Sequence, residues 1–202
     1  MNDDILISFE NFGFQYTTQA EPTLYNIDLQ IKRGEKVLIA GPSGCGKSTI
    51  AHCINGLIPA AYPGKSTGSL TVGGQDAAKL GLFGLSKIVG TVLQDSDGQF
   101  IGLTVAEDIA FALENDCVPR DQLHRRVEET ALLTGVDRVL EHAPHELSGG
   151  QKQRVGLAGV MVNSVDLLLF DEPLANLDPA TGKQTIEGVS YTFGEDGALI
   201  MQ

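Results

Sequence analysis

Residues 41–48 have the types and the spacing of a phosphate-binding loop. They read G-P-S-G-C-G-K-S, which satisfies the pattern G-x-x-x-x-G-K-[ST]. Glycines let successive backbone N–H groups turn toward phosphate oxygens, and the start of a following helix adds its positive dipole end. In such a loop Lys47 contacts the β- and γ-phosphates of a nucleotide, and the Ser48 hydroxyl binds Mg²⁺. The candidate ATP-binding residues of the loop are Gly41, Pro42, Ser43, Gly44, Cys45, Gly46, Lys47, Ser48 and Thr49.

Two acids follow an apolar run in residues 165–173, which read V-D-L-L-L-F-D-E-P. A continuous apolar run is typical of a strand buried on both faces of a parallel sheet, and ligands of such sheets collect at the carboxyl ends of the strands. Asp171 would then emerge beside the phosphate loop and hold Mg²⁺ through water, and Glu172 would polarise the attacking water. Alone, these acids would be better explained as a solvated strand end, but together with the phosphate loop they indicate catalysis.

Residues 147–154, L-S-G-G-Q-K-Q-R, predict a second site for an anion. Ser148 and Gln151 have the spacing of a capping box, so a helix is expected to begin here with exposed N–H groups. Gly149 and Gly150 permit close approach. One nucleotide has a single γ-phosphate, which the first loop already holds. The second site is therefore expected to serve a nucleotide bound to another copy or subunit.

The elements that must position these groups can also be predicted. Residues 36–40 form a short apolar run before the phosphate loop, which predicts a buried strand, and a helix is expected from Lys47 onward. Between Gln94 and Ser148 the pattern becomes helical. Thr104 and Glu107 have the spacing of another capping box, and Gly135 is expected to end a second helix.

Length, composition and net charge limit the classes of protein and the partners that remain possible. With 202 residues, 42% of them hydrophobic, the chain can form one sizeable core, or one core with a small additional subdomain. A net charge of −12 gives no general attraction to nucleic acid. Three cysteines without C-x-x-C spacing argue against a disulfide framework or a zinc site and favour a reducing compartment. The chain begins without the features of a signal peptide, and its apolar runs are too short to span a bilayer.

The order of these motifs resembles that of the nucleotide-binding domain of an ABC ATPase, over nearly all of residues 5–183. The resemblance implies an α/β fold of the P-loop NTPase type, with a mixed sheet, an N-terminal antiparallel β part and an inserted helical subdomain. It implies a core in residues 1–94 and 155–187 and a helical subdomain in residues 95–154, all within a domain of residues 1–187.

The resemblance also assigns roles to three further residues. Tyr16 would stack on adenine, Gln94 would connect Mg²⁺ and the attacking water to a membrane partner, and Asp178 would lie at the dimer interface with the Ser148 site. Tyr16 could instead be a core aromatic, and Gln94 a surface amide.

The activity implied by the resemblance is hydrolysis of ATP, with Mg²⁺, coupled to transport. The implied partners are a second ABC ATPase domain and integral membrane subunits, with no nucleic acid, and the implied location is cytoplasmic, on the inner face of the cell membrane. Residues 55–74 and 94–115 are similar to the ATPase subunits of energy-coupling-factor importers of vitamins, their precursors, cobalt or nickel. Ser96 departs from that pattern, in which proline is common. The alternatives are a non-transport ABC ATPase, acting in nucleic-acid repair or on ribosomes, and a nucleotide-binding module with little turnover.

The last residues resemble the first ones: residues 186–193 read I-E-G-V-S-Y-T-F, and residues 9–16 read F-E-N-F-G-F-Q-Y. A helix is expected over residues 179–187, beginning at Pro179, and it is followed by strand-forming residues. In one interpretation residues 197–201 are the domain's own last strand. In the preferred one, residues 188–202 are a truncated tail that begins another ATPase copy, with Phe193 in the place of Tyr16. Either way the C-terminal part is expected to be incomplete, without the family's switch histidine, and weak or inactive in hydrolysis.

Overall fold

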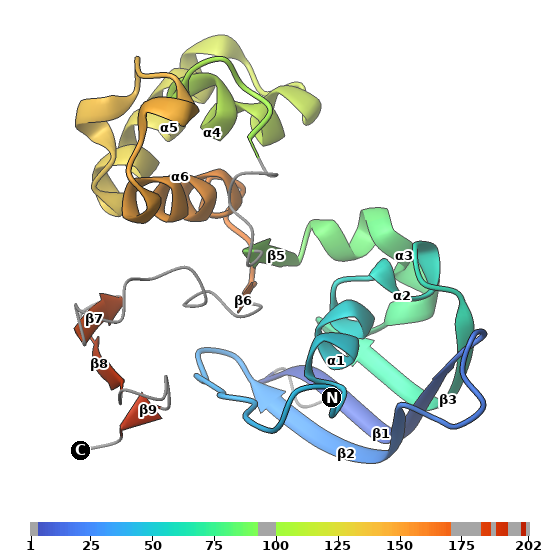
Figure 1. The fold of residues 1–202 in the computed structure, drawn as a ribbon. Coiled ribbons are helices and arrows are strands. Elements are labelled where there is room, and N and C mark those ends of the chain that lie inside the picture. The colour runs from blue at the N-terminus through green and yellow to red at the C-terminus, as the bar shows by residue number, and fades with distance from the viewer. Residues whose placement is uncertain (1–3, 93–99, 171–182, 187–188, 194–198, 201–202) are drawn as a thin grey trace.

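The computed structural model describes residues 4–92, 100–170, 183–186, 189–193 and 199–200, and the regular elements lie in these ranges (Figure 1). An N-terminal unit of sheet and helices and a helical unit lie on opposite sides of a short pair of parallel strands. None of the helices in these ranges has the length and the apolar character needed to cross a membrane.

The N-terminal unit is built on a four-stranded antiparallel sheet, as expected. Its strands, in the spatial order β2-β1-β3-β4, are β2 (Leu24–Lys32), β1 (Ile5–Tyr16), β3 (Gly64–Val72) and β4 (Gln75–Asp76). Three helices accompany it: α1 (Lys47–Ile54), α2 (Leu57–Ala60) and α3 (Ala77–Ser86). Phe9 and Phe14 of β1, Val72 of β3 and Leu85 of α3 are buried in one hydrophobic core. This core fixes the end of β1 relative to α1.

The helical unit contains α4 (Val105–Asn115), α5 (Arg120–Thr134) and α6 (Gly149–Met161), with 3₁₀ turns at Asp137–Val139 and Pro144–Glu146. Val105, Ile109 and Leu113 of α4 form a separate core with residues of α5 and α6. The capping box at the start of α4 is confirmed, because Thr104 Oγ1 accepts from the Glu107 N–H and Glu107 Oε2 accepts from the Thr104 N–H. The end of α5 is also confirmed, since Gly135 follows it with a left-handed φ of 69°.

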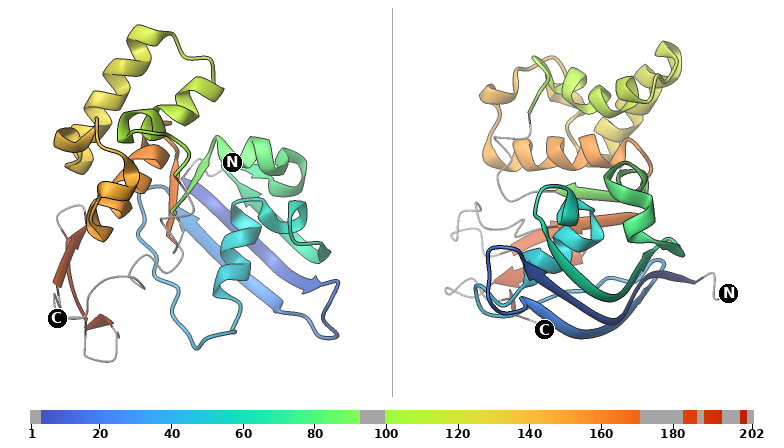
Figure 2. Two further views of the ribbon diagram at one scale, coloured as in Figure 1. Left: turned by 45° about the horizontal axis from the view of Figure 1, so that its top comes forward. Right: turned by 90° about the vertical axis from the view of Figure 1, so that its right-hand side faces the viewer.

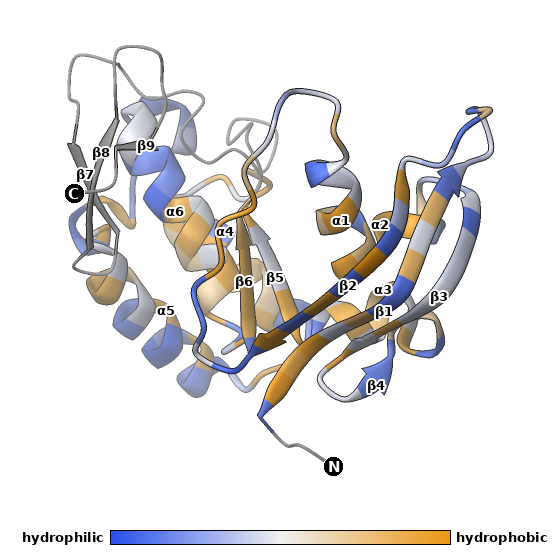
Figure 3. Cartoon of the chain, turned by 90° about the horizontal axis from the view of Figure 1, so that it is seen from below, coloured by the Kyte–Doolittle hydropathy of each residue, from blue (hydrophilic) through white to orange (hydrophobic). Residues whose placement is uncertain are grey.

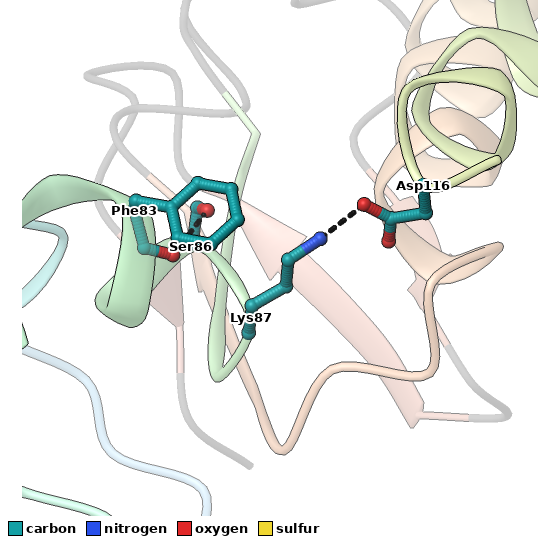
Figure 4. Close-up of polar contacts among 4 residues, drawn as sticks. All are labelled: Phe83, Ser86, Lys87 and Asp116. Carbon is teal, nitrogen blue, oxygen red and sulfur yellow. Dashed lines mark hydrogen bonds and ion pairs between the residues drawn. The ribbon is translucent and has the colours of Figure 1, made fainter.

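The two units meet at the parallel strands β5 (Val89–Val92) and β6 (Leu167–Phe170). Helix α6 lies against this pair, as the two views in Figure 2 show. The contact requires a glycine, because a Cβ on Gly90 would lie 2.1 Å from Val160 Cγ1. A second contact joins α3 and α4: Lys87, whose ammonium lies 5.2 Å from the centre of the Phe83 ring, forms an ion pair with Asp116 (Figure 4).

Two strand predictions around this pair need correction. Residues 36–40 do not form a strand, and Leu38 is 69% exposed; they are the hydrophobic coil between β2 and α1 in Figure 3. Strand β6 forms and is hydrophobic along its length, but it is half-buried and Phe170 is 39% exposed. The physical reason is that a strand needs neighbours for its N–H and C=O groups. In the described part of the chain no strand pairs with residues 36–40, and this segment lies outside the β5–β6 sheet.

The C-terminal region differs from the prediction in one element. Of the helix expected from Pro179, residues 179–182 lie outside the described residues, and Lys183–Ile186 is a strand, β7. It pairs with β8 (Val189–Phe193), which pairs with β9 (Leu199–Ile200). β-Branched residues such as Thr185 and Ile186 favour a strand when a partner is adjacent, which explains the error. The strand character of residues 189–193 is confirmed, and the second ATPase copy stays a prediction.

Candidate nucleotide-binding site

The phosphate loop leads directly into α1, which begins at Lys47 as predicted. The Cys45 N–H donates to the Pro42 carbonyl at 3.3 Å, closing a turn inside the loop. Gly46 ends this turn with a φ of 98°, and a Cβ there would lie 2.8 Å from Leu24 Cδ2 at the start of β2. Both observations require glycine, so the loop is seated against the antiparallel sheet.

Lys47 folds back over the loop that precedes it. Its Nζ donates to the carbonyl oxygens of Gly41 and Pro42, each at 2.9 Å. Ser48 follows it in the first turn of α1 and is half-buried. An ammonium held at the mouth of the loop and exposed N–H groups at a helix start form a binding arrangement for an anion.

Tyr16 reaches the same helix from the end of β1. Its hydroxyl lies 3.0 Å from Thr49 Oγ1, and its ring packs edge-on against Phe14, with 4.9 Å between the ring centres. The structure therefore places Tyr16 beside Thr49 of α1, and Tyr16 also packs against the N-terminal core. Its adenine-stacking role stays a prediction. Two neighbours were missed: Tyr62 packs edge-on against Tyr16, and His52 stacks on Tyr62 at 4.8 Å. The sequence contained one signal for this aromatic cluster: Thr49 and His52 are three residues apart, so they lie on the same face of a helix.

The helix start predicted to be the second anion site is the beginning of α6. Gln151 N–H donates to Ser148 Oγ at 3.4 Å, and Ser148 N–H donates to Gln151 Oε1 at 2.9 Å, which confirms the predicted capping box. A Cβ on Gly149 or Gly150 would meet no atom within 4 Å, so the space around both is open. Helix α6 packs in the helical unit and α1 in the N-terminal unit, so the two predicted anion sites belong to different parts of the fold (Figure 1).

The other predicted site residues, Gln94, Asp171, Glu172 and Asp178, lie outside the described residues. The strands that precede them end side by side, since Val92 of β5 is opposite Phe170 of β6 in a parallel ladder. Carboxyl ends of parallel strands form the usual ligand edge of such sheets. Among the described residues there is no group of three or more His, Cys, Asp or Glu side chains that could hold a metal.

The three thiols differ in exposure. Cys45 and Cys117 are exposed, whereas Cys53 is buried in the N-terminal core. Burial raises the pKa of the Cys53 thiol to about 12, so this group stays protonated and unreactive at neutral pH. Thiol reagents are therefore expected to modify the exposed Cys45 and Cys117 rather than the buried Cys53.

Alkylation with N-ethylmaleimide is expected to block nucleotide binding through Cys45, because an added group in the phosphate loop occupies space needed by the phosphates. Mg-ATP should protect Cys45 but not Cys117, as read by mass spectrometry of the labelled peptides. The Cys45→Ser variant is the control and should bind ATP after the same treatment. Equal labelling of Cys45 with and without saturating ATP would contradict the expectation.

The loop, the helix that follows it and the sheet beside it define a P-loop nucleotide-binding domain. A sequence model of the family described as ABC transporter matches residues 24–175. The chain belongs to the ABC transporter family.

Similar proteins agree with this assignment. The chain is 58% identical, over 185 residues, to a protein of Streptococcus mutans described as an ABC transporter ATP-binding protein, with 92% of this chain and 33% of that protein covered. It is 59% identical, over 196 residues, to a protein of the same description from Enterococcus faecalis, with 97% and 34% covered. The chain thus spans about a third of the length of these relatives.

A solved structure has the same fold. It is CbiO1 from Clostridium perfringens, described as part of the ABC transporter complex CbiONQ. The TM-score is 0.78 and the sequence identity 33%, with 88% of this chain and 69% of that chain covered. The expected α/β P-loop fold, with an antiparallel N-terminal sheet and helices, is confirmed.

Proposed function

We propose that this chain is the ATP-binding and ATP-hydrolysing part of an ABC-type importer of the energy-coupling-factor class. The observation that carries the proposal is the presence of two anion sites in different units of one fold. The phosphate loop leads into the start of α1, and the Ser148 capping box lies at the start of α6. A single nucleotide on one copy cannot use both sites through its one γ-phosphate, so the working unit is a pair of domains arranged head to tail.

In this pair, each ATP lies between two domains. Lys47 and Ser48 of one domain hold the phosphates and Mg²⁺, and Ser148, Gly149 and Gly150 of the other enclose the γ-phosphate. Gln94 and Asp171 complete the Mg²⁺ site, Glu172 orients the attacking water, and Asp178 contacts the opposite domain. Catalysis in such a site consists of positioning and charge stabilisation around the phosphoryl group.

The second domain is supplied by a tandem copy or by another chain. The tandem arrangement is supported by the relatives' length, about three times the matched stretch, and by the likeness of residues 186–193 to residues 9–16. The importer class is supported by the similarity to CbiO1, which is itself part of an ABC transporter complex. The transported molecule is chosen by the membrane subunits in this proposal.

The membrane subunits dock near Gln94, on the cytoplasmic side of the cell membrane. The segments on both sides of Gln94 in the sequence expose large apolar side chains, with Phe83 78% and Leu103 81% exposed. Contiguous exposed apolar patches mark contact surfaces, and in this proposal Phe83 and Leu103 contribute to one when the membrane subunits dock. Closure of the domain pair on ATP would move these segments, and with them the membrane partner.

The nucleic-acid alternative is less well supported, because the net charge is −12. The alternative of a nucleotide-binding module with little turnover makes a different prediction for the full-length protein, which the following experiment separates.

The 202-residue chain is expected to bind Mg-ATP, measured by isothermal titration calorimetry, and to hydrolyse it slowly. Slow hydrolysis is expected because, in this proposal, each site is completed by the Ser148 helix start of a second domain, with which the chain must first pair. The full-length protein should hydrolyse ATP at least about tenfold faster in a phosphate-release assay, as expected when the chemical step depends on positioned groups. Absence of ATP binding by the chain would overturn the proposal, and equally slow hydrolysis by the full-length protein would favour the binding module.

A further inference from the structure

The hydroxyl groups of Tyr16 and Thr49 form a direct link between the base side and the phosphate side of the site. They lie 3.0 Å apart, although the residues are 33 positions apart in the sequence. Tyr16 ends β1, and Thr49 is in the first turn of α1, immediately after the two residues expected to hold phosphate and Mg²⁺. The link therefore connects two elements that the backbone does not connect locally.

The two partners differ in exposure in a way that suits these positions. Thr49 is 6% exposed, so its hydroxyl is largely shielded from water, whereas Tyr16 as a whole is half-buried. A hydrogen bond between groups shielded from water is strong enough to orient a side chain, and leaving one partner unsatisfied is costly. Thr49 can thus fix the direction of the Tyr16 ring without covering it.

Neighbouring contacts hold the same ring from other sides. Phe14 and Tyr62 pack edge-on against Tyr16, and His52 of α1 stacks on Tyr62 with 12° between the ring planes. The next residue, Thr17, donates its N–H and its hydroxyl to the Pro63 carbonyl, each at 3.1 Å. These contacts limit Tyr16 to a narrow range of positions, within which the Thr49 hydroxyl selects one.

We propose that Thr49 is a positioning residue for base recognition, which acts by holding Tyr16 at a fixed distance and angle from the phosphate loop. The inference rests on the proposed ATP-binding function and adds a residue-specific coupling to it. A hydroxyl offers one donor and two acceptor sites, so Thr49 Oγ1 can bond to Tyr16 and still contact another group. The base then contributes to the binding free energy only when the phosphates occupy the loop at the distance from Tyr16 that the nucleotide requires.

A double-mutant cycle on the 202-residue chain tests this coupling, with Mg-ATP affinity measured by isothermal titration calorimetry. Tyr16→Phe keeps the ring and removes the hydroxyl, and it is expected to weaken ATP binding about 3- to 10-fold, the effect of one hydrogen bond. In the Thr49→Val background the same change should have no further effect. In the Thr49→Ser background, which retains a hydroxyl, the effect of Tyr16→Phe should return. Additive effects of Tyr16→Phe and Thr49→Val would overturn the proposal.

Inorganic tripolyphosphate, which has no base, separates positioning from a general structural role. Tyr16→Phe should leave tripolyphosphate affinity unchanged while it weakens ATP binding. Equal weakening of both would show that the hydroxyl pair only stabilises the loop, and would overturn the proposal even if Thr49→Val did not fold. The proposed function fails separately, when the unmodified chain does not bind ATP at all, and in that case the inference falls with it.

Discussion

Replacing Glu172 by glutamine in the full-length protein is expected to lower ATP hydrolysis about 100-fold or more, which is the effect of losing a general base. Glutamine has nearly the same shape as glutamate but cannot polarise the attacking water through a negative charge. ATP binding should persist, because the groups that hold the phosphates, Lys47 and Ser48, are unchanged. The ATP-bound pair of domains should therefore accumulate, since ATP joins the domains and hydrolysis releases them.

Phosphate release and small-angle X-ray scattering with and without ATP measure the two parts of this prediction. Glu128→Gln, an exposed change on α5, is the matched control and should hydrolyse ATP like the unmodified protein. Equal hydrolysis rates for Glu172→Gln and the unmodified protein would remove Glu172 from the catalytic role. A variant that neither hydrolyses nor closes on ATP would place Glu172 in binding instead.

Replacing Lys47 by alanine is expected to weaken Mg-ATP binding about 100-fold, because charge-assisted hydrogen bonds are the strongest polar contacts of such a site. The Lys47 ammonium donates at 2.9 Å to the Gly41 and Pro42 carbonyls, so it also holds the loop in shape. Both functions are lost in the alanine variant. Isothermal titration calorimetry on the 202-residue chain measures the change.

Lys79→Ala is the control for the loss of a positive charge, because Lys79 lies on α3 and forms an ion pair with Asp76 at the start of that helix. Its ATP affinity should match that of the unmodified chain. A second variant, Lys47→Arg, keeps the charge but changes its shape, and it is expected to recover only part of the affinity. Lys47→Ala binding ATP as tightly as Lys79→Ala would contradict the phosphate-binding role of the loop.

Features that depend on a few neighbouring residues could be predicted from the sequence. The capping boxes at Thr104 and Ser148 each use a partner three residues away, and the left-handed end of α5 depends on Gly135 alone. The start of α1 at Lys47 follows from the loop pattern. In all of these the chemistry that fixes the backbone is local, so the sequence contains it directly.

Features that depend on distant partners were less predictable. Residues 36–40 have the composition of a buried strand, but they lie outside the β5–β6 ladder and remain exposed. Residues 183–186 form a strand because β8 is beside them, where the sequence favoured a helix. Apolar or β-branched character shows that a segment can pair, and only the neighbouring strands decide whether it does.

The Tyr16–Thr49 hydrogen bond belongs to the same category, because it joins the end of a strand to a helix 33 residues later. The phosphate loop and the family resemblance predicted that both residues serve the nucleotide, but neither predicted a contact between them. The register of β1 with β2 and β3 sets the position of Tyr16 at the end of β1. From there the Tyr16 hydroxyl reaches Thr49 of α1. Packing of the whole N-terminal unit thus creates the link.

The most direct test of the paired arrangement is a structure of the full-length Glu172→Gln protein with Mg-ATP bound. Each γ-phosphate should lie between Lys47 of one ATPase domain and the helix start corresponding to Ser148–Gly150 of the facing domain, within hydrogen-bonding distance of both. A nucleotide-loaded structure in which the Ser148 helix start faces solvent, with no phosphate of a neighbouring domain near it, would contradict this account.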